Sequence, residues 1–211
     1  MWGTFMKRFA KKGFILLDPG DVGPIHFFSA KPIKSAADLK AHKVWQWGED
    51  ELVKTMFKKL GVKGVPMGVP SVLSSLTTGK INACYGSPLS TVALQWYTKV
   101  KYMTSFNTSF GVSATVIKKE AWDKMSDEDR DKVKKALRTQ AKKLRKTVRK
   151  DNVRAQKAIV RSGVKVIEID DANKAKFREV AEQVWNEMQG KMYSKKDLER
   201  VLKYREEFRS K

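Results

Sequence analysis

Aromatic side chains are the residues of this sequence best placed to contact a ligand. Trp45 and Trp47 alternate along one strand-like stretch, and Tyr85 and Ser87 lie at the end of another. Indole and phenol rings offer flat faces for stacking, and each carries one polar group that forms hydrogen bonds. The chemistry that these residues favour is non-covalent binding, although packing in a core explains any one of the rings equally well.

Groups that could carry catalysis are few. The two histidines are His26 and His42, and the sequence contains neither an HExxH nor a GxSxG motif. The single cysteine, Cys84, has no base near it in the sequence, so a small buried side chain is favoured over a nucleophile. We therefore expect no enzyme activity, no catalytic residue, no metal site and no cofactor.

An acidic pair, Glu49 and Asp50, precedes a stretch with helical spacing. One of these carboxylates could act as a polar contact or a general base. Acids at a helix N-terminus also complement the helix dipole and bond the first free N–H groups. Helix capping is the favoured interpretation.

The charge balance of the chain is strongly basic. Its 44 Lys and Arg residues against 23 Asp and Glu residues give a net charge of +21. Residues 132–161 contain thirteen of these cations and a single acid, Asp151. A nucleic-acid- or polyanion-binding module that works through this segment is the alternative function. Apolar residues recur there at helical spacing and aromatic residues are absent, so a solvated helix face without a specific nucleic-acid partner is favoured.

The sequence pattern between residues 33 and 100 predicts the secondary structure that positions the candidate binding residues. Strand-like stretches alternate with helical ones, which is typical of a parallel sheet in an α/β lobe. The expected strands are 43–47, 65–67 and 81–85, and the expected helices are 49–60, 71–76 and 89–97. Ligands of such lobes bind beyond the carboxyl ends of the strands, where both aromatic stretches lie.

The flanking segments predict further elements. A short basic helix over 2–12 leads to a strand at 13–17, which a turn at Asp18-Pro19-Gly20 ends, and a second strand follows at 25–30. Ser126 and Asp129 predict the start of a long amphipathic helix that reaches about residue 161. The other expected elements are β-structure within 101–117, a strand at 164–169, and helices at 171–189 and 194–209.

Targeting signals are not expected within this sequence. No stretch approaches the roughly 18 apolar residues that a membrane span requires. The basic start followed by the apolar run 13–17 imitates a signal peptide, but the run is too short and no small-residue cleavage site follows it.

Four stretches, in their order over roughly residues 13–185, resemble the periplasmic substrate-binding proteins of TRAP transporters, the DctP family. The first two resemble the opening of the family's second lobe and the region that follows it. The third resembles the start of the family's long helix, and the fourth resembles a later strand. The stretches are KPIKSAADLKAHKVW, LGVKGVPMGVPSVLSSLTTGKINACYGSPLS, ATVIKKEAWDKMSDEDRDKV and SGVKVIEID.

The resemblance implies an α/β fold with a periplasmic-binding-protein-like lobe, a parallel or mixed sheet and long C-terminal amphipathic helices. Family members are longer and begin with a first-lobe strand and helix that this sequence lacks, so the two-lobe architecture is expected to be incomplete. Residues 1–32 would be a remnant of the first lobe and a hinge crossing, and residues 33–103 the second lobe. Residues 104–211 would hold the return crossing, the long helix and the C-terminal helices.

The function that the resemblance implies is solute capture in the periplasm and delivery to the membrane permease of a tripartite transporter. Family members hold a ligand carboxylate with an arginine, whose aligned position is Trp45 here, and Lys31 occupies a second basic position. Ser87 replaces an asparagine. The ligand is expected to be an organic acid, or an aromatic or weakly polar compound stacked on Trp45. The expected ligand-binding residues are Lys31, Trp45, Trp47, Met67, Tyr85 and Ser87.

Overall fold

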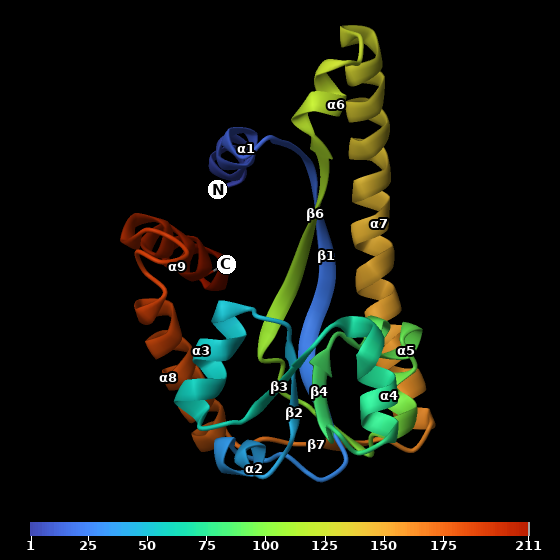
Figure 1. The fold of residues 1–211 in the computed structure, drawn as a ribbon, viewed down its shortest axis with the longest axis vertical. Coiled ribbons are helices and arrows are strands. Elements are labelled where there is room, and N and C mark those ends of the chain that lie inside the picture. Colours follow the sequence, from blue (N-terminus) through green and yellow to red (C-terminus); the bar gives the residue numbers. More distant parts are fainter. Residues whose placement is uncertain (211) are drawn as a thin grey trace.

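The computed structural model describes residues 1–210, which form a mixed α/β fold (Figure 1). The helices are α1 (Trp2–Lys11), α2 (Ala36–Lys40), α3 (Glu51–Leu60), α4 (Val72–Thr77), α5 (Pro88–Ala93), α6 (Lys119–Asp123), α7 (Asp127–Arg161), α8 (Asp171–Glu187) and α9 (Lys195–Arg209). The strands are β1 (Phe14–Ser29), β2 (Val44–Trp47), β3 (Gly64–Met67), β4 (Ala83–Gly86), β5 (Tyr102–Thr104), β6 (Ser109–Lys118) and β7 (Lys165–Ile167).

The lower part of the molecule is built on a sheet with the strand order β3-β2-β4-β1-β5-β7. Strand β2 is parallel to both β3 and β4, whereas β1 runs antiparallel to β4 and β5. The alternating strands and helices expected over 33–100 are therefore confirmed, and the sheet is mixed because β1 enters it in the opposite direction.

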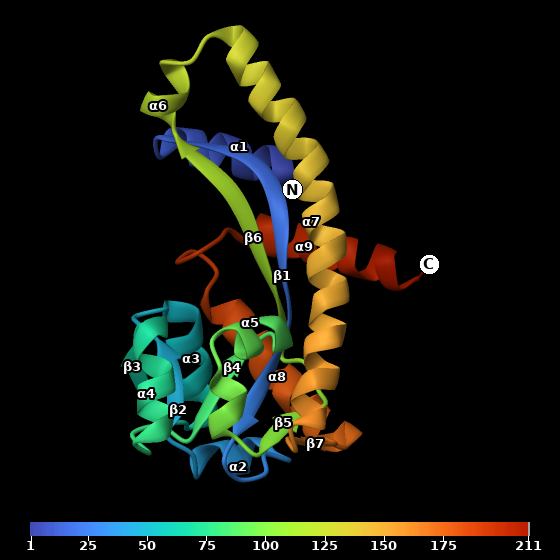
Figure 2. The ribbon, with the colours of Figure 1, turned by 90° about the vertical axis from the view of Figure 1, so that its right-hand side faces the viewer.

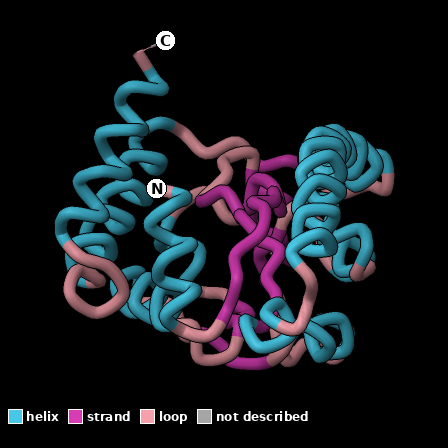
Figure 3. The backbone as a smooth tube through the Cα atoms, turned by 90° about the horizontal axis from the view of Figure 1, so that it is seen from above, coloured by secondary structure: helices cyan, strands magenta, loops and turns pink. Residues whose placement is uncertain are grey.

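Two hydrophobic cores lie on opposite faces of this sheet, since successive strand residues point to opposite sides. Phe28, Trp45 and Cys84 belong to the core shared with α4 and α7, whereas their neighbours Phe27, Val44 and Ala83 belong to the core shared with α3 and α8. Figure 3 shows the strands between two groups of helices. Burial on both faces explains why these strands read as apolar runs.

Strand β1 departs from the sequence-based expectation. A turn was expected at Asp18-Pro19-Gly20, but the chain continues through it as one strand of 16 residues. Strand β6 pairs along this segment, with Pro19 opposite Ala114 and register shifts between Leu16 and Asp18 and between Asp21 and Gly23. Such irregularities let a strand accommodate a proline, which has no N–H to donate.

The β1–β6 ribbon, residues 14–25 with 109–118, rises out of the sheet (Figure 2). Over residues 14–25 strand β1 pairs only with β6, because its pairs with β4 and β5 begin at His26 and Phe28. Phe110, Val112 and Val116 are 48%, 77% and 44% exposed along β6. The ribbon therefore presents an uncovered apolar face within the described structure.

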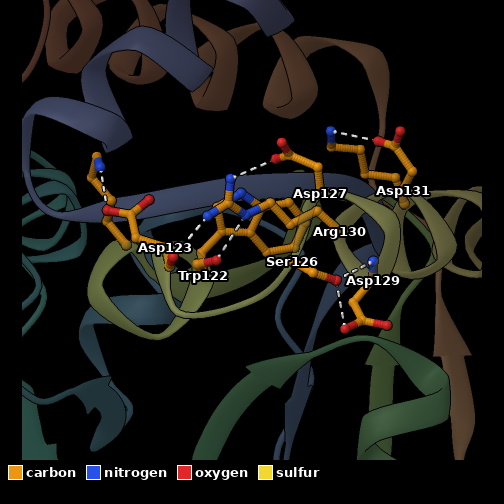
Figure 4. A network of polar contacts seen from close by, with 9 residues as sticks. Trp122, Asp123, Ser126, Asp127, Asp129, Arg130 and Asp131 are labelled. Carbon is orange, nitrogen blue, oxygen red and sulfur yellow. Dashed lines mark hydrogen bonds and ion pairs between the residues drawn. The ribbon is translucent and has the colours of Figure 1, made fainter.

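Helix α7 begins at a corner that a polar network fixes (Figure 4). The Ser126 Oγ accepts a hydrogen bond from the Asp129 N–H, as expected from the sequence. The Arg130 guanidinium donates to the carbonyls of Trp122 and Asp123 and to the Asp127 carboxylate, at 3.0, 2.8 and 3.0 Å. This arginine joins the end of α6 to the first turn of α7, and the carboxylates complement the helix dipole.

Further along α7, the side-chain amide of Asn152 connects the helix to the ribbon and to the lower part of the molecule. The Asn152 Nδ2 donates to the Val22 carbonyl, and its Oδ1 accepts from the Leu89 N–H at the start of α5, at 3.0 and 3.1 Å. Gly23 has a φ of +119°, and a Cβ there would lie 2.8 Å from the Asn152 Cγ. Only glycine fits this crossing of β1 beneath α7.

Candidate ligand-binding site

The carboxyl ends of three parallel strands bring Trp47, Met67 and Tyr85 together. Trp47 is the register partner of Met67 at the ends of β2 and β3. The Trp47 backbone N–H donates to the Tyr85 hydroxyl at the end of β4, at 3.1 Å. This edge of the sheet is where the sequence placed the candidate site, and it is the position at which open α/β sheets bind ligands.

Trp45 lies behind this edge. Its side chain is 2% exposed, and its indole N–H donates to the Met67 carbonyl at 2.9 Å. The ring stacks on Tyr85 at 4.9 Å and meets Trp96 edge-on at 5.1 Å between ring centroids. Both its face and its N–H are therefore already engaged within the protein.

Trp47 is the ring of this cluster that solvent reaches, because it is 57% exposed and ends its strand. It lies 6.1 Å from Trp45, with 27° between the ring planes. An exposed ring supported from behind by a stacked partner offers a fixed flat face. Trp47 is consequently the best placed side chain of the edge for stacking against a ligand.

Tyr85 supplies a neutral hydroxyl to the edge. Burial raises the pKa of Tyr85 to about 12, against the opposing effect of the hydrogen bond from the Trp47 N–H. Because the oxygen accepts that N–H, the phenolic proton is left to donate. The edge can therefore offer one hydrogen-bond donor beside the Trp47 ring.

Ser87 has a structural task in this fold. It is 1% exposed, and its Oγ accepts from the Ser90 N–H at 3.2 Å as the N-cap of α5. Pro88 follows at the first helical position, which suits its fixed φ. The Ser87 hydroxyl thus orients the turn after β4.

Lys31 is not brought to this edge. Strand β1 is antiparallel to β4, so its end lies beside the start of β4, where the Ala30 N–H donates to the Asn82 carbonyl at 2.9 Å. The Lys31 carbonyl accepts from the Ser29 Oγ and lies 3.2 Å from the His42 Nε2. The structure places Lys31 at the opposite edge of the sheet because β1 reverses direction relative to its neighbour.

The acidic pair beside Trp47 has its expected capping role. The Asp50 Oδ1 accepts from the N–H groups of Leu52 and Val53, at 2.9 and 3.1 Å. Glu49 forms an ion pair with Lys54 at 2.9 Å. Both carboxylates therefore have partners within the first turn of α3, and capping is confirmed for Asp50.

His26 also borders the edge, although its position in the sequence gave no sign of this. It is the register partner of Gly86, and its Nδ1 lies 2.8 Å from the Thr104 carbonyl. A carbonyl only accepts, so Nδ1 carries the proton. Burial lowers the pKa of His26, against the opposing effect of the hydrogen bond to Thr104, and so favours the neutral ring. Only the pairing of β1 with β4 reveals this neighbour.

Other candidate groups are accounted for. Cys84 is fully buried in a hydrophobic core, as expected, and burial raises the pKa of its thiol far above the usual range. Within residues 1–210 no group of three or more His, Cys, Asp or Glu side chains could hold a metal ion. In the same residues, no helix has the length and apolar character that a membrane crossing needs.

Comparisons with known proteins agree on one family. The profile of the bacterial extracellular solute-binding proteins, family 7 (DctP), matches residues 1–192. A solute-binding protein of Chromohalobacter salexigens is 26% identical over 183 residues, which are 85% of this chain and 54% of that protein. The chain thus spans about half the length of this curated relative.

Solved structures show the same fold. A TRAP periplasmic solute-binding protein from Sulfitobacter, with bound β-D-galacturonate, has a TM-score of 0.82 and 25% identity over 88% of this chain and 61% of its own. A Bordetella pertussis extracytoplasmic solute receptor that binds pyroglutamic acid has a TM-score of 0.86 and 20% identity over 96% of this chain and 66% of its own. The α/β fold expected from the sequence is confirmed.

Proposed function

Since this chain belongs to the DctP family of bacterial extracellular solute-binding proteins, we propose that it is the solute-capturing part of a TRAP transporter receptor. The observation that carries the proposal is the position of Trp47, Met67 and Tyr85 at the carboxyl ends of three parallel strands. The receptor would work in the periplasm and deliver its ligand to the permease subunits of the transporter.

The ligand that we propose is a small organic acid with a ring, such as a sugar acid. The exposed Trp47 face suits the C–H face of a pyranose, and the Tyr85 hydroxyl can donate to a ring substituent. The net charge of +21 creates a field that attracts anions from a distance. A galacturonate-bound relative of 25% identity supports this class of ligand.

The cluster of Trp45, Trp47 and Tyr85 contains no positively charged group that could hold the carboxylate of the ligand. Trp45 occupies the position where the resemblance places an arginine, and its N–H is bonded to Met67. The ligand carboxylate at this edge would therefore be held by positively charged side chains that a closing movement of the protein brings over it. The β1–β6 ribbon, which we propose as the hinge, is the element that would bring them.

A thermal-shift screen tests this function. D-galacturonate, L-pyroglutamate and an aromatic acid would be compared with neutral D-galactose at moderate salt. A ligand that binds the native state alone raises the melting temperature by mass action. We expect a reproducible rise with at least one acid and none with galactose.

The location of the site is tested with matched variants. Trp47→Ala is expected to abolish the ligand-induced rise, whereas Phe208→Ala, at a ring 82% exposed on α9, is expected to retain it. An unchanged rise in the Trp47→Ala protein would contradict the site. Absence of a rise with every acid in the wild type would contradict the proposed ligand class.

A further inference from the structure

The outward face of α7 carries a stripe of lysines. Lys135, Lys142, Lys146, Lys150 and Lys157 are all exposed, and a helix turns by about 100° per residue, so their spacings of seven, four, four and seven place them on one face. The opposite face packs against β1 and α5. At about 1.5 Å per residue, the stripe extends for roughly 33 Å.

The stripe has no charge compensation within residues 1–210. Four of the thirteen cations in 132–161 form ion pairs, namely Lys132, Lys134, Arg149 and Arg154. None of the five stripe lysines has a carboxylate within ion-pair distance. Lys142, Lys146 and Lys150 follow one another at i, i+4, a spacing at which like charges destabilise a helix. The stripe therefore lowers the stability of helix α7, and its exposed lysines are not needed for packing the helix against β1 and α5.

The stripe is also accessible along most of the long axis of the molecule. Helix α7 stands along one side of the molecule, with the ribbon on its inner side (Figure 1). Helix α9, which crosses α7 in the view of Figure 2, lies on the other side of the molecule in Figure 1. The acids of α7 are Asp127, Glu128 and Asp129 in the first turn, and further along Asp131 and Asp151, which form ion pairs with Lys134 and Arg154. Residues 132–161 thus present a long ridge with thirteen cations and one acid.

We propose that this lysine stripe docks the protein on an anionic phospholipid bilayer. A long row of charges matches a surface with spread negative charge, and clustered lysines are attracted to anionic headgroups. Lysine ammonium groups act as point charges without the guanidinium fork or aromatic rings that favour nucleic acids. Docking in this way would concentrate the receptor beside a membrane, which goes beyond solute capture.

The test uses the whole chain and vesicles of stated composition. Partitioning onto vesicles of phosphatidylglycerol and phosphatidylcholine at one to three is compared with pure phosphatidylcholine, at about 0.1 M salt. The test variant is Lys142→Gln/Lys146→Gln/Lys150→Gln, and the control is Lys34→Gln/Lys63→Gln/Lys80→Gln, which removes equal charge from exposed sites elsewhere. A urea denaturation curve for each protein checks that it folds.

We expect the wild type to bind the anionic vesicles and not the neutral ones. The stripe variant should lose at least about 30-fold in partition coefficient, and the control should lose less than about fivefold. Equal losses in both variants would overturn the proposal, because net charge would then explain the binding. Equal binding of wild type to both vesicles, or displacement from anionic vesicles by an equal phosphate concentration of duplex DNA, would also overturn it.

Discussion

Two tryptophans two residues apart differ in exposure at the candidate site. Both Trp45 and Trp47 point to the same side of β2, yet one is buried and the other is 57% exposed because the strand ends at Trp47. The sequence predicts the cluster and its strand correctly. Which ring solvent reaches depends on Trp96 and Tyr85, which close over Trp45 from distant segments.

This difference in burial predicts losses of stability of different size for two similar substitutions. Trp45→Ala would leave a cavity between Tyr85 and Trp96 and should lower the free energy of unfolding by about 3–5 kcal/mol. Trp47→Ala should lower it by less than about 1 kcal/mol, since an exposed ring loses little burial. Urea denaturation of both variants checks this, and equal losses would contradict the assignment of Trp45 to the core.

A single ion pair connects α1 with α9 and predicts a pH dependence. The Arg8 guanidinium donates to the Asp197 carboxylate at 2.6 Å, and with the Ser194 hydroxyl it lowers the pKa of Asp197 from 3.8 to about 2. A carboxyl with a depressed folded-state pKa stabilises the fold above its unfolded pKa. That contribution is lost as the pH falls from about 4 towards 2.

Comparison with Asp197→Asn isolates this group. The melting temperature of the wild type should exceed that of the variant at pH 6, and the difference should shrink as the pH falls below about 4. A difference that stays constant from pH 6 to pH 3 would show that the ion pair does not titrate as described. Sequence alone could not pair residues 189 positions apart.

At the scale of elements, local chemistry predicts most helix and strand boundaries. Pairing with a neighbouring strand prevents one turn that the sequence predicts. The caps at Asp50 and Ser126 come from residue types that act within one turn of a helix, so they were predictable. Asp18-Pro19-Gly20 reads as a turn, yet β6 pairs along it and keeps it extended. Strand pairing at long range therefore outweighs local preference there.

The crossing of β1 under α7 predicts a strong response at Gly23. Gly23→Ala combines a positive φ with a clash against Asn152 and should destabilise the protein by about 1–3 kcal/mol or more. Gly3→Ala is the matched control, because that position is open and helical and alanine should stabilise it slightly. Denaturation curves in which both variants behave alike would contradict the described crossing.

The ribbon should be the least protected β-structure. Over residues 14–25 of β1 and 109–118 of β6, each strand has the other as its one partner, and the ribbon has an exposed apolar face. Two-stranded ribbons are marginally stable in water. Amide hydrogen exchange of the chain should therefore be faster at 110–116 than at 83–86 in the sheet. Equal protection of the two strands would indicate that the ribbon is covered.

At the scale of the whole molecule, the order of motifs predicted the family and the fold. The resemblance covered roughly residues 13–185, and the family profile matches residues 1–192. The position of Lys31 could not be predicted in this way, because an alignment of motifs does not show that β1 and β4 are antiparallel. The chain spans 61% of the Sulfitobacter protein. Solute capture is the function of a whole receptor, and it is therefore a proposal for this chain.

The measurement that tests the site most directly is a titration of the isotope-labelled chain with D-galacturonate, followed by two-dimensional NMR. We predict that the Trp47 indole signal and the amide signals of Met67 and Tyr85 shift together with one saturation curve. The Trp45 indole signal should move little, because its N–H stays bonded to Met67. Shifts confined to other surfaces, or a Trp47 signal that stays fixed while others saturate, would contradict the site.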